Sequence, residues 1–244
     1  MEMLVTRATL LRRPALLRRL ARDNRGTALM EFAFATPLVL ALGLYGVEIG
    51  NQALTHMRLS QIALNLADNA SRMGLIGNNN VETMREGDMN DMLQAVRLQG
   101  EGINLTKNGR IIVSSLENVQ QSYDSAPVQR IHWQRCIGMQ RGTGFDSEYS
   151  TSTNAGTTST VTDAGTAMPG GMGTAGSKVN APPNSAVMYV EVNYLYEPIV
   201  TQWLSSPFRM QYRASMIVRN NRDYRQIYNP SSYARRSTCN LYTS

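Results

Sequence analysis

The two cysteines, Cys136 and Cys239, are the side chains whose chemistry depends most directly on the compartment of the protein. Neither belongs to a CxxC pair, so the sequence does not suggest a metal or dithiol site. In an oxidising compartment they can join in one way only, and the bond would close a loop of about 100 residues, worth up to about 4.7 kcal/mol in the chain-entropy model. The alternative is two separate buried thiols. Export of this part of the chain would favour the disulfide.

The two histidines, His56 and His132, are the next candidates for chemistry, but nothing in the 244 residues supports catalysis by either. No HExxH, GxSxG or GxxxxGK motif is present. Residues 171–176 match GxGxxG, but no predicted strand precedes them and no predicted helix follows. We expect His56 on a helix and His132 on the outward face of a strand, both solvated. The sequence therefore predicts no catalytic residue, no metal site and no cofactor, and a protein that is not an enzyme.

Glu31 is a carboxylate at the start of an apolar segment. Phe32 to Val47 is a run of 16 residues without a charge, and the 24 residues from Thr27 to Gly50 would form a helix of about 36 Å, enough for a hydrocarbon core of about 30 Å. A carboxylate near the end of a membrane helix costs less than the ~3 kcal/mol of a central one, but it needs a headgroup position or a partner. We expect a transmembrane helix over residues 27–50.

Positive charge is concentrated before this segment. The net charge is +6, and residues 1–25 hold seven arginines against Glu2 and Asp23, a net charge of +5, which leaves +1 for residues 26–244. By the positive-inside rule the N-terminus is cytoplasmic and the C-terminal bulk is exported. Because the body of the protein is nearly neutral, it offers no footprint for a phosphate backbone, and no nucleic-acid partner is expected.

Three other interpretations of the apolar segment remain open. A secretory signal peptide would be cut after small residues such as Ala41-Leu42-Gly43, although the apolar run continues to Val47. A mitochondrial presequence shares the arginine-rich start, but it is rarely followed at once by a spanning helix. A buried core helix of a soluble protein is disfavoured by the length and by the one-sided arginine cluster.

A short motif connects the basic leader to the apolar helix. It begins with Gly26, continues with four residues from Thr27 on, and ends with the acidic Glu31 and the aromatic Phe32. This order resembles the type IV prepilins, and most closely the TadE-like pseudopilins of the tight-adherence (Flp) pilus machinery. The resemblance implies that a prepilin peptidase cuts after Gly26 and leaves Thr27 as the new N-terminus. It also implies that Glu31 pairs with the amino group of Thr27 on an adjacent subunit, which would offset the cost of both charges.

The helix is predicted to continue beyond the membrane as an extension over residues 51–74. Gly46 and Gly50 form a GxxxG spacing that allows two helices to approach closely, although glycines are common in membrane helices in any case. Apolar residues then recur at three- and four-residue steps up to Gly74, at Leu59, Ile62, Ala63, Leu66, Ala70 and Met73. We expect the protein's own globular part, rather than a partner, to cover this stripe.

Residues 75–244 are predicted to form an exported α+β domain. A turn region and a short helix over 75–94 precede four strands, at residues 110–116, 131–139, 187–196 and 208–218. Alternation of apolar and polar residues predicts an antiparallel sheet of about four strands, with one wet face and the other covered by the long helix. Residues 142–183 are rich in glycine, threonine and serine, and are expected to be a mobile surface insertion.

The sequence thus predicts a minor pseudopilin, a structural or assembly component of a Flp-type (Tad) adhesive pilus. Its expected partners are the prepilin peptidase, other pseudopilins or pilin subunits, and the inner membrane. Its expected location is the inner membrane, in a single pass, with the C-terminal domain in the periplasm or associated with the pilus at the cell surface. The alternative is a permanently anchored periplasmic binding or adhesion protein that keeps residues 1–26.

Overall fold

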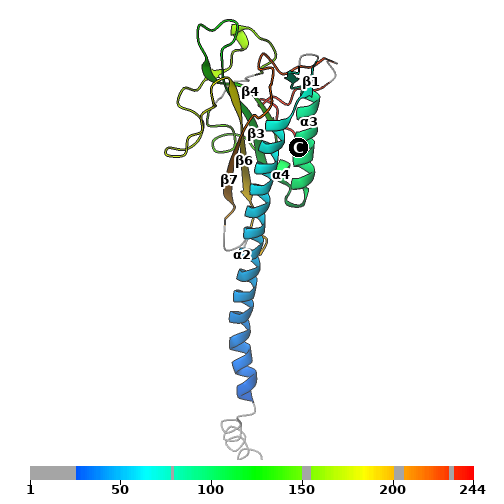
Figure 1. Cartoon of the computed structure of the whole chain (residues 1–244). Helices are drawn as coiled ribbons and strands as arrows, with labels where there is room; N and C mark the ends of the chain where they lie inside the picture. The colour runs from blue at the N-terminus through cyan, green and yellow to red at the C-terminus, as the bar shows by residue number, and fades with distance from the viewer. Residues whose placement is uncertain (1–25, 78–79, 150–154, 201–205, 231–233) are drawn as a thin grey trace, which may run out of the picture. The chain divides into compact units, whose positions relative to one another are not determined.

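The computed structural model describes residues 26–77, 80–149, 155–200, 206–230 and 234–244. The basic leader before Gly26 lies outside these residues. The chain divides into two compact units, residues 1–49 and residues 50–244, and Figure 1 shows the elements of both. The fold combines one long N-terminal apolar helix with an antiparallel sheet, which confirms the α+β class.

Helix α2 spans Thr27–Arg72, 46 residues in all, and contains Pro37. The transmembrane and extension segments predicted from the sequence are therefore one helix, which ends two residues before Gly74. Near its C-terminal end the buried Arg222 donates hydrogen bonds to the carbonyl oxygens of Ala70, Ser71 and Met73, at 3.2, 3.2 and 2.6 Å. The last carbonyls of a helix have no partner within the helix, so this guanidinium supplies both the missing donors and a favourable charge.

The main sheet has five antiparallel strands in the order β5-β4-β3-β6-β7. Their bounds are β3 Gly109–Val119, β4 Val128–Ile137, β5 Thr166–Ala167, β6 Ser185–Tyr196 and β7 Phe208–Ile217. The expected number of four strands was wrong, because β5 adds a two-residue strand from within residues 142–183. A separate two-stranded sheet joins β1 Leu75–Ile76 to β2 Glu82–Thr83.

Short helices follow the small sheet. Helix α3 spans Glu86–Gly100, six residues further than predicted, and is followed by η2 Glu101–Ile103 and α4 Leu105–Asn108. A further 3₁₀ turn, η3, spans Val161–Asp163.

The main core lies between the helices and one face of the sheet. The apolar stripe of α2 is buried there, at Leu59, Ile62, Ala63, Leu66 and Ala70, together with Met89, Leu93 and Val96 of α3. The sheet contributes Ile111 and Val113 of β3, and Met188, Val190 and Val192 of β6. The expectation that the protein's own globular part covers this stripe is confirmed.

The second face of the sheet is covered rather than wet, which corrects the sequence prediction. Met172 and Ala181, both within residues 142–183, are buried there against a second apolar cluster of Leu116, Ile131, Val187 and Tyr189. Polar residues on the same face, Ser114, Gln134, Glu191 and Asn193, are buried as well. The described part of this insertion therefore acts as a layer over the sheet, because its side chains and main chain supply partners for the polar positions.

Candidate functional site

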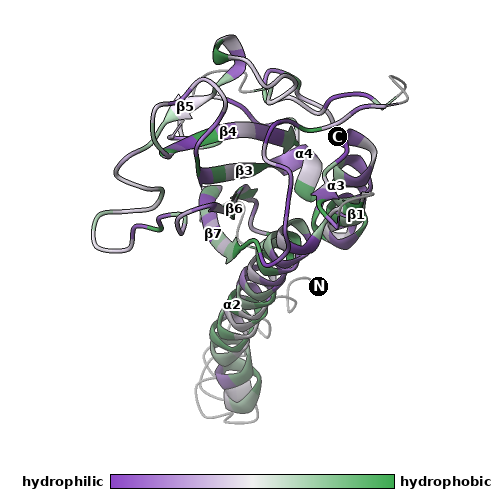
Figure 2. Cartoon of the chain, turned by 45° about the horizontal axis from the view of Figure 1, so that its top comes forward, coloured by the Kyte–Doolittle hydropathy of each residue, from purple (hydrophilic) through white to green (hydrophobic). Residues whose placement is uncertain are grey.

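The part of α2 within residues 27–49 presents apolar side chains to its surroundings. Leu29, Phe32, Phe34 and Leu42 are each at least 70% exposed, and Figure 2 shows hydrophobic residues along this part of the helix. The helix is long and apolar enough to cross a membrane. Each exposed Å² of apolar surface costs about 25 cal/mol in water, so burial of this surface would be favourable.

The four residues of the predicted processing motif lie together at the start of α2. Gly26 immediately precedes the helix, and Thr27 is its first residue. The Glu31 and Phe32 side chains are exposed, and Glu31 makes no hydrogen bond or ion pair with any residue that the structure describes. A carboxylate is thus available to a partner within the first two turns of an uncovered apolar helix.

The two glycines of the predicted packing motif leave the helix surface open. At both Gly46 and Gly50, a Cβ would meet no atom within 4 Å. A neighbouring helix could therefore approach the backbone closely at each position. Whether a helix does so stays a prediction.

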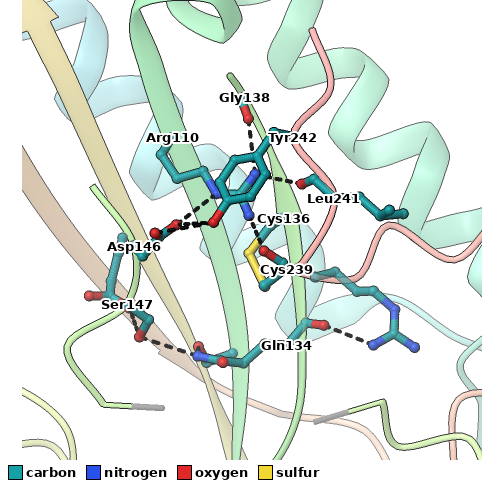
Figure 3. The surroundings of a disulfide bond; sticks show 12 residues. Arg110, Gln134, Cys136, Gly138, Asp146, Ser147, Cys239, Leu241 and Tyr242 are labelled. Carbon is teal, nitrogen blue, oxygen red and sulfur yellow. Dashed lines mark hydrogen bonds and ion pairs between the residues drawn. A yellow bond between two sulfur atoms is a disulfide. The ribbon is translucent and has the colours of Figure 1, made fainter. Parts of the chain in front are cut away.

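The cysteines form the single disulfide that the sequence allowed, Cys136–Cys239, with Cα atoms 4.8 Å apart. Figure 3 shows how Arg110 holds the same C-terminal segment. Its fully buried guanidinium donates to the carbonyl oxygens of Gly138 and Leu241, at 2.9 and 2.8 Å, and to that of Cys239. These contacts fix the C-terminal end against β4. Bonded cysteines are typical of oxidising compartments.

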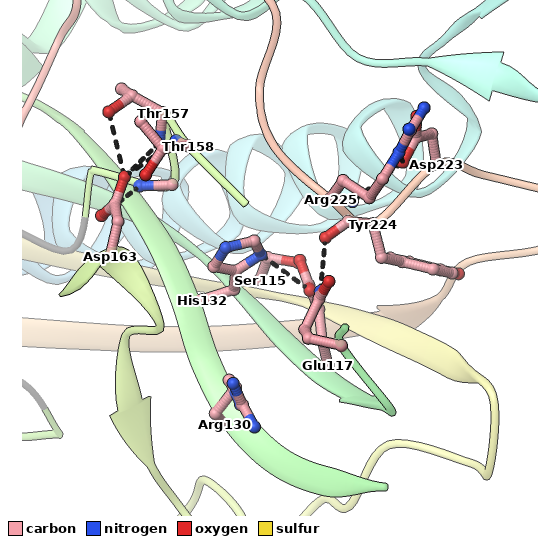
Figure 4. A network of polar contacts seen from close by, with 12 residues as sticks. Ser115, Glu117, Arg130, His132, Thr157, Thr158, Asp163, Asp223, Tyr224 and Arg225 are labelled. Atoms are coloured by element: carbon pink, nitrogen blue, oxygen red, sulfur yellow. Dashed lines mark hydrogen bonds and ion pairs between the residues drawn. The ribbon is translucent and has the colours of Figure 1, made fainter. Parts of the chain in front are cut away.

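His132 is buried, not solvated, and this corrects the sequence prediction. Its Nδ1 lies 2.9 Å from Oε2 of the buried Glu117, as Figure 4 shows. Burial lowers the pKa of His132, but the charge of Glu117 and the hydrogen bond raise it more, so the pKa lies above its usual value. His132 and Glu117 therefore form a buried ion pair when the imidazole is protonated, a state that the raised pKa favours. The described residues contain no group of three or more potential metal ligands.

His56 is also engaged, since its Nδ1 and the Tyr212 hydroxyl share a hydrogen bond between α2 and β7. Its side chain is half-buried rather than fully solvated.

A second buried ion pair was not anticipated from the sequence. Arg135 and Glu86 are both fully buried, and Arg135 Nε donates to Glu86 Oε2 at 2.9 Å. A second guanidinium nitrogen donates to Glu86 and also to the Ala155 carbonyl oxygen, 2.7 Å away. A buried pair of this kind holds α3 to β4. The sequence of strand β4 shows Arg135 between Gln134 and Cys136, but its alternating pattern gives no information about the distant partner Glu86.

Glu191 of β6 is a buried carboxylate whose acidity is strongly perturbed, on the face of the sheet that residues 142–183 cover. It accepts a hydrogen bond from the Ser147 hydroxyl at 2.7 Å, while its other carboxylate oxygen has no partner among the described residues. Burial raises its pKa to about 7, although Ser147 and the nearby Arg213 act in the opposite direction. The neutral form of Glu191 is therefore favoured by folding.

Glu191→Gln is expected to flatten the fall of stability with rising pH. Because the pKa rises from 4.5 in the unfolded chain to about 7 in the folded one, the folded state binds more protons, and stability is lost between pH 4.5 and 7. The loss amounts to about 3 kcal/mol. Urea unfolding of the wild type and of Glu191→Gln from pH 4.5 to 8 measures the difference between their free energies of unfolding. The contribution of His132 is the same in both proteins and cancels in this difference.

Glu101→Gln provides the matched control, because the Glu101 side chain is exposed and its charge is not among those that act on the pKa of Glu191. It should leave the pH dependence close to that of the wild type. Equal slopes for Glu191→Gln and the wild type would contradict a raised pKa for Glu191.

Two kinds of site therefore coexist in the chain. One is an uncovered apolar helix that carries a carboxylate near its start, and the other is a set of buried ion pairs and a disulfide within residues 50–244. The ion pairs lie within the fold, whereas the apolar side chains of residues 27–49 are exposed. Comparisons with protein-family models, curated proteins and solved structures found no match.

Proposed function

We propose that this chain is a minor pseudopilin, a structural or assembly component of a Tad-type adhesive pilus. It inserts in the inner membrane through residues 27–50, with the N-terminus in the cytoplasm and the disulfide-bonded part in the periplasm. A prepilin peptidase cuts after Gly26, and the uncovered helix then packs with other pseudopilins or pilin subunits.

The observation that carries the proposal is the position of Glu31. Its exposed carboxylate lies on a helix whose neighbouring side chains are apolar and uncovered. A simple anchor gains nothing from such a charge, which costs free energy in an apolar layer. A subunit that pairs it with the new amino group of an adjacent Thr27 does gain, because two opposite charges offset each other's desolvation.

Two further observations support the orientation. The seven arginines of residues 1–25 favour a cytoplasmic N-terminus. The Cys136–Cys239 disulfide suits the oxidising periplasm, where such bonds persist.

Cleavage after Gly26 is the direct test. In cells with an active prepilin peptidase, N-terminal sequencing or intact-mass measurement should find Thr27 as the first residue. Gly26→Val is expected to keep residues 1–26 attached, because the branched side chain obstructs the protease next to the bond to be cut. The retained fraction, measured by mass, should rise from a small minority to nearly the whole population.

Gly43→Val is the matched control, since a Cβ at Gly43 also meets no atom within 4 Å and the residue lies outside the motif. This variant should be processed normally. A wild-type protein that keeps residues 1–26 despite an active peptidase would overturn the proposal, and would favour a permanently anchored binding or adhesion protein.

A further inference from the structure

The two long edges of the five-stranded sheet are treated differently by the fold. On the β4 side, β5 pairs with Arg130 and Ile131. The C-terminal segment continues the closure, because the Cys136 and Gly138 amides donate to the carbonyl oxygens of Ser237 and Thr243, both at 2.7 Å. The disulfide and Arg110 hold that segment in place. Exposed strand edges promote pairing with other chains, and these contacts cover this edge at residues 130, 131, 136 and 138.

At the opposite edge, strand β7 pairs with β6 and with no second strand among the residues that the structure describes. Its sheet partner is β6, with Val187 opposite Ile217 and Tyr196 opposite Phe208. The Val218 amide donates to the Ala186 carbonyl oxygen, which shows that the even-numbered residues of this strand bond to β6. In an antiparallel pair, hydrogen-bonded residues alternate with residues that point away. The main-chain groups of the odd-numbered residues 209–217 therefore point to the open edge, where none of the described main chain pairs with them.

The side chains along β7 differ between its two faces. Arg209 and Arg213 lie four residues apart on the face that also bears Glu191 in the neighbouring strand, opposite Arg213. On the other face, Phe208, Tyr212 and Met216 are partly buried against the main core. Arg213 forms an ion pair with Glu148, whereas Arg209 is exposed. An added strand would meet cationic groups on one face and apolar groups on the other.

We propose that the β7 edge docks an extended segment of a partner protein that carries carboxylates on one face and apolar side chains on the other. The segment extends the sheet by one antiparallel or parallel strand, so main-chain hydrogen bonds to residues 209–217 supply affinity. Its carboxylates, four residues apart, pair with Arg209 and Arg213 and set the register. β7 contains no acidic residue. A second copy of β7 at this edge would therefore place arginines beside Arg209 and Arg213 and supply no carboxylate to pair with them.

A designed peptide probes this edge directly. The probe is a fluorescent ten-residue peptide with blocked ends, in which valine alternates with threonine and two threonines four positions apart are replaced by glutamate. Its control carries lysine in place of both glutamates. Fluorescence anisotropy with the full chain in detergent should show about tenfold tighter binding of the glutamate peptide, as two ion pairs of ~0.7 kcal/mol each imply.

Removal of one outward-facing amide separates main-chain pairing from charge attraction. Gln211→Pro deletes a donor at the open edge without touching the bonds to β6, and proline is tolerated on edge strands in that orientation. This variant should bind the glutamate peptide at least about tenfold more weakly, because it loses that hydrogen bond and regular strand geometry. Gln211→Ala keeps the amide and should bind the peptide as the wild type does.

A second form of the peptide keeps the test decisive if Gln211→Pro fails to fold. Methylation of alternate peptide nitrogens on the edge-facing side should abolish binding to the unmodified protein. Binding that survives this methylation, or equal binding of Gln211→Pro and Gln211→Ala, would overturn strand addition. Failure of the wild type to bind the glutamate peptide would also overturn it, and would leave Arg209 and Arg213 as charges that keep the edge unpaired.

Discussion

Glu31→Ala is expected to abolish assembly with other subunits and to leave membrane insertion intact. The substitution removes a charge from an uncovered apolar helix, so insertion becomes easier by up to about 3 kcal/mol. We expect assembly to suffer, because the carboxylate proposed to pair with the amino group of Thr27 on an adjacent subunit is removed. We expect at least about a tenfold drop in the protein recovered with sheared pili or with cross-linked partner subunits. Removing one partner of a desolvated charge pair costs about 3 to 5 kcal/mol, more than the ~1.4 kcal/mol that a tenfold change requires.

Met30→Ala serves as the matched control, because Met30 is a neighbouring residue of the same helix whose side chain is also exposed. It removes apolar contact area without removing a charge. Glu31→Gln tests the charge itself, since it keeps the size of the side chain, and should behave as Glu31→Ala does. Membrane fractionation verifies insertion of each variant. Normal assembly of Glu31→Ala would remove the main support for a pseudopilin and favour a simple anchor.

The regular elements could be predicted well because their periodicity is local. The 3.6-residue period of α2 and the alternation in β6 and β7 are written into consecutive residues. The predicted strand over 208–218 thus lies within one residue of β7, Phe208–Ile217, and the predicted 187–196 lies within two residues of β6, Ser185–Tyr196.

The layer formed by the described part of residues 142–183 could not be predicted in the same way. Its composition of glycine, threonine and serine carries no period, and β5 is only two residues long. This layer is held by hydrogen bonds between residues distant in sequence, such as those of Ser147 with Glu191 and of Phe145 with Asn193. Polar residues that alternate along a strand have the same sequence pattern whether their hydrogen-bond partners are water molecules or another segment of the chain. The pattern therefore does not distinguish an exposed face from a covered one.

His132 was misplaced because the alternation is broken beside it. Ser115 of β3 lies opposite Trp133, but the next residue, Leu116, lies opposite Ile131, so His132 is the extra residue of a β-bulge. A bulge re-aims a side chain, and this one lets the His132 imidazole reach Glu117. The disulfide needed no such detail, because two cysteines allow one connectivity.

Among changes outside helix α2, Glu86→Ala is expected to have the largest effect on stability. Glu86 is the first residue of α3, and both it and Arg135 are fully buried. Among the described residues, its loss leaves the buried Arg135 guanidinium with the carbonyl oxygens of Gln134 and Ala155 and the more distant Trp133 ring as partners. Breaking such a pair from one side costs about 3 to 5 kcal/mol, a large share of the ~5 to 15 kcal/mol that stabilises a typical domain.

Urea unfolding of the full chain in detergent, followed by near-ultraviolet circular dichroism, measures this loss. Asp91→Ala is the matched control, because Asp91 lies on the same helix α3 with an exposed side chain, and it should change stability by less than about 0.5 kcal/mol. The double variant Glu86→Met with Arg135→Met should recover part of the loss, since replacing both partners leaves no uncompensated charge. A double variant that is less stable than Glu86→Ala alone would show that Arg135 stabilises α3 and β4 through its carbonyl contacts and not through the ion pair.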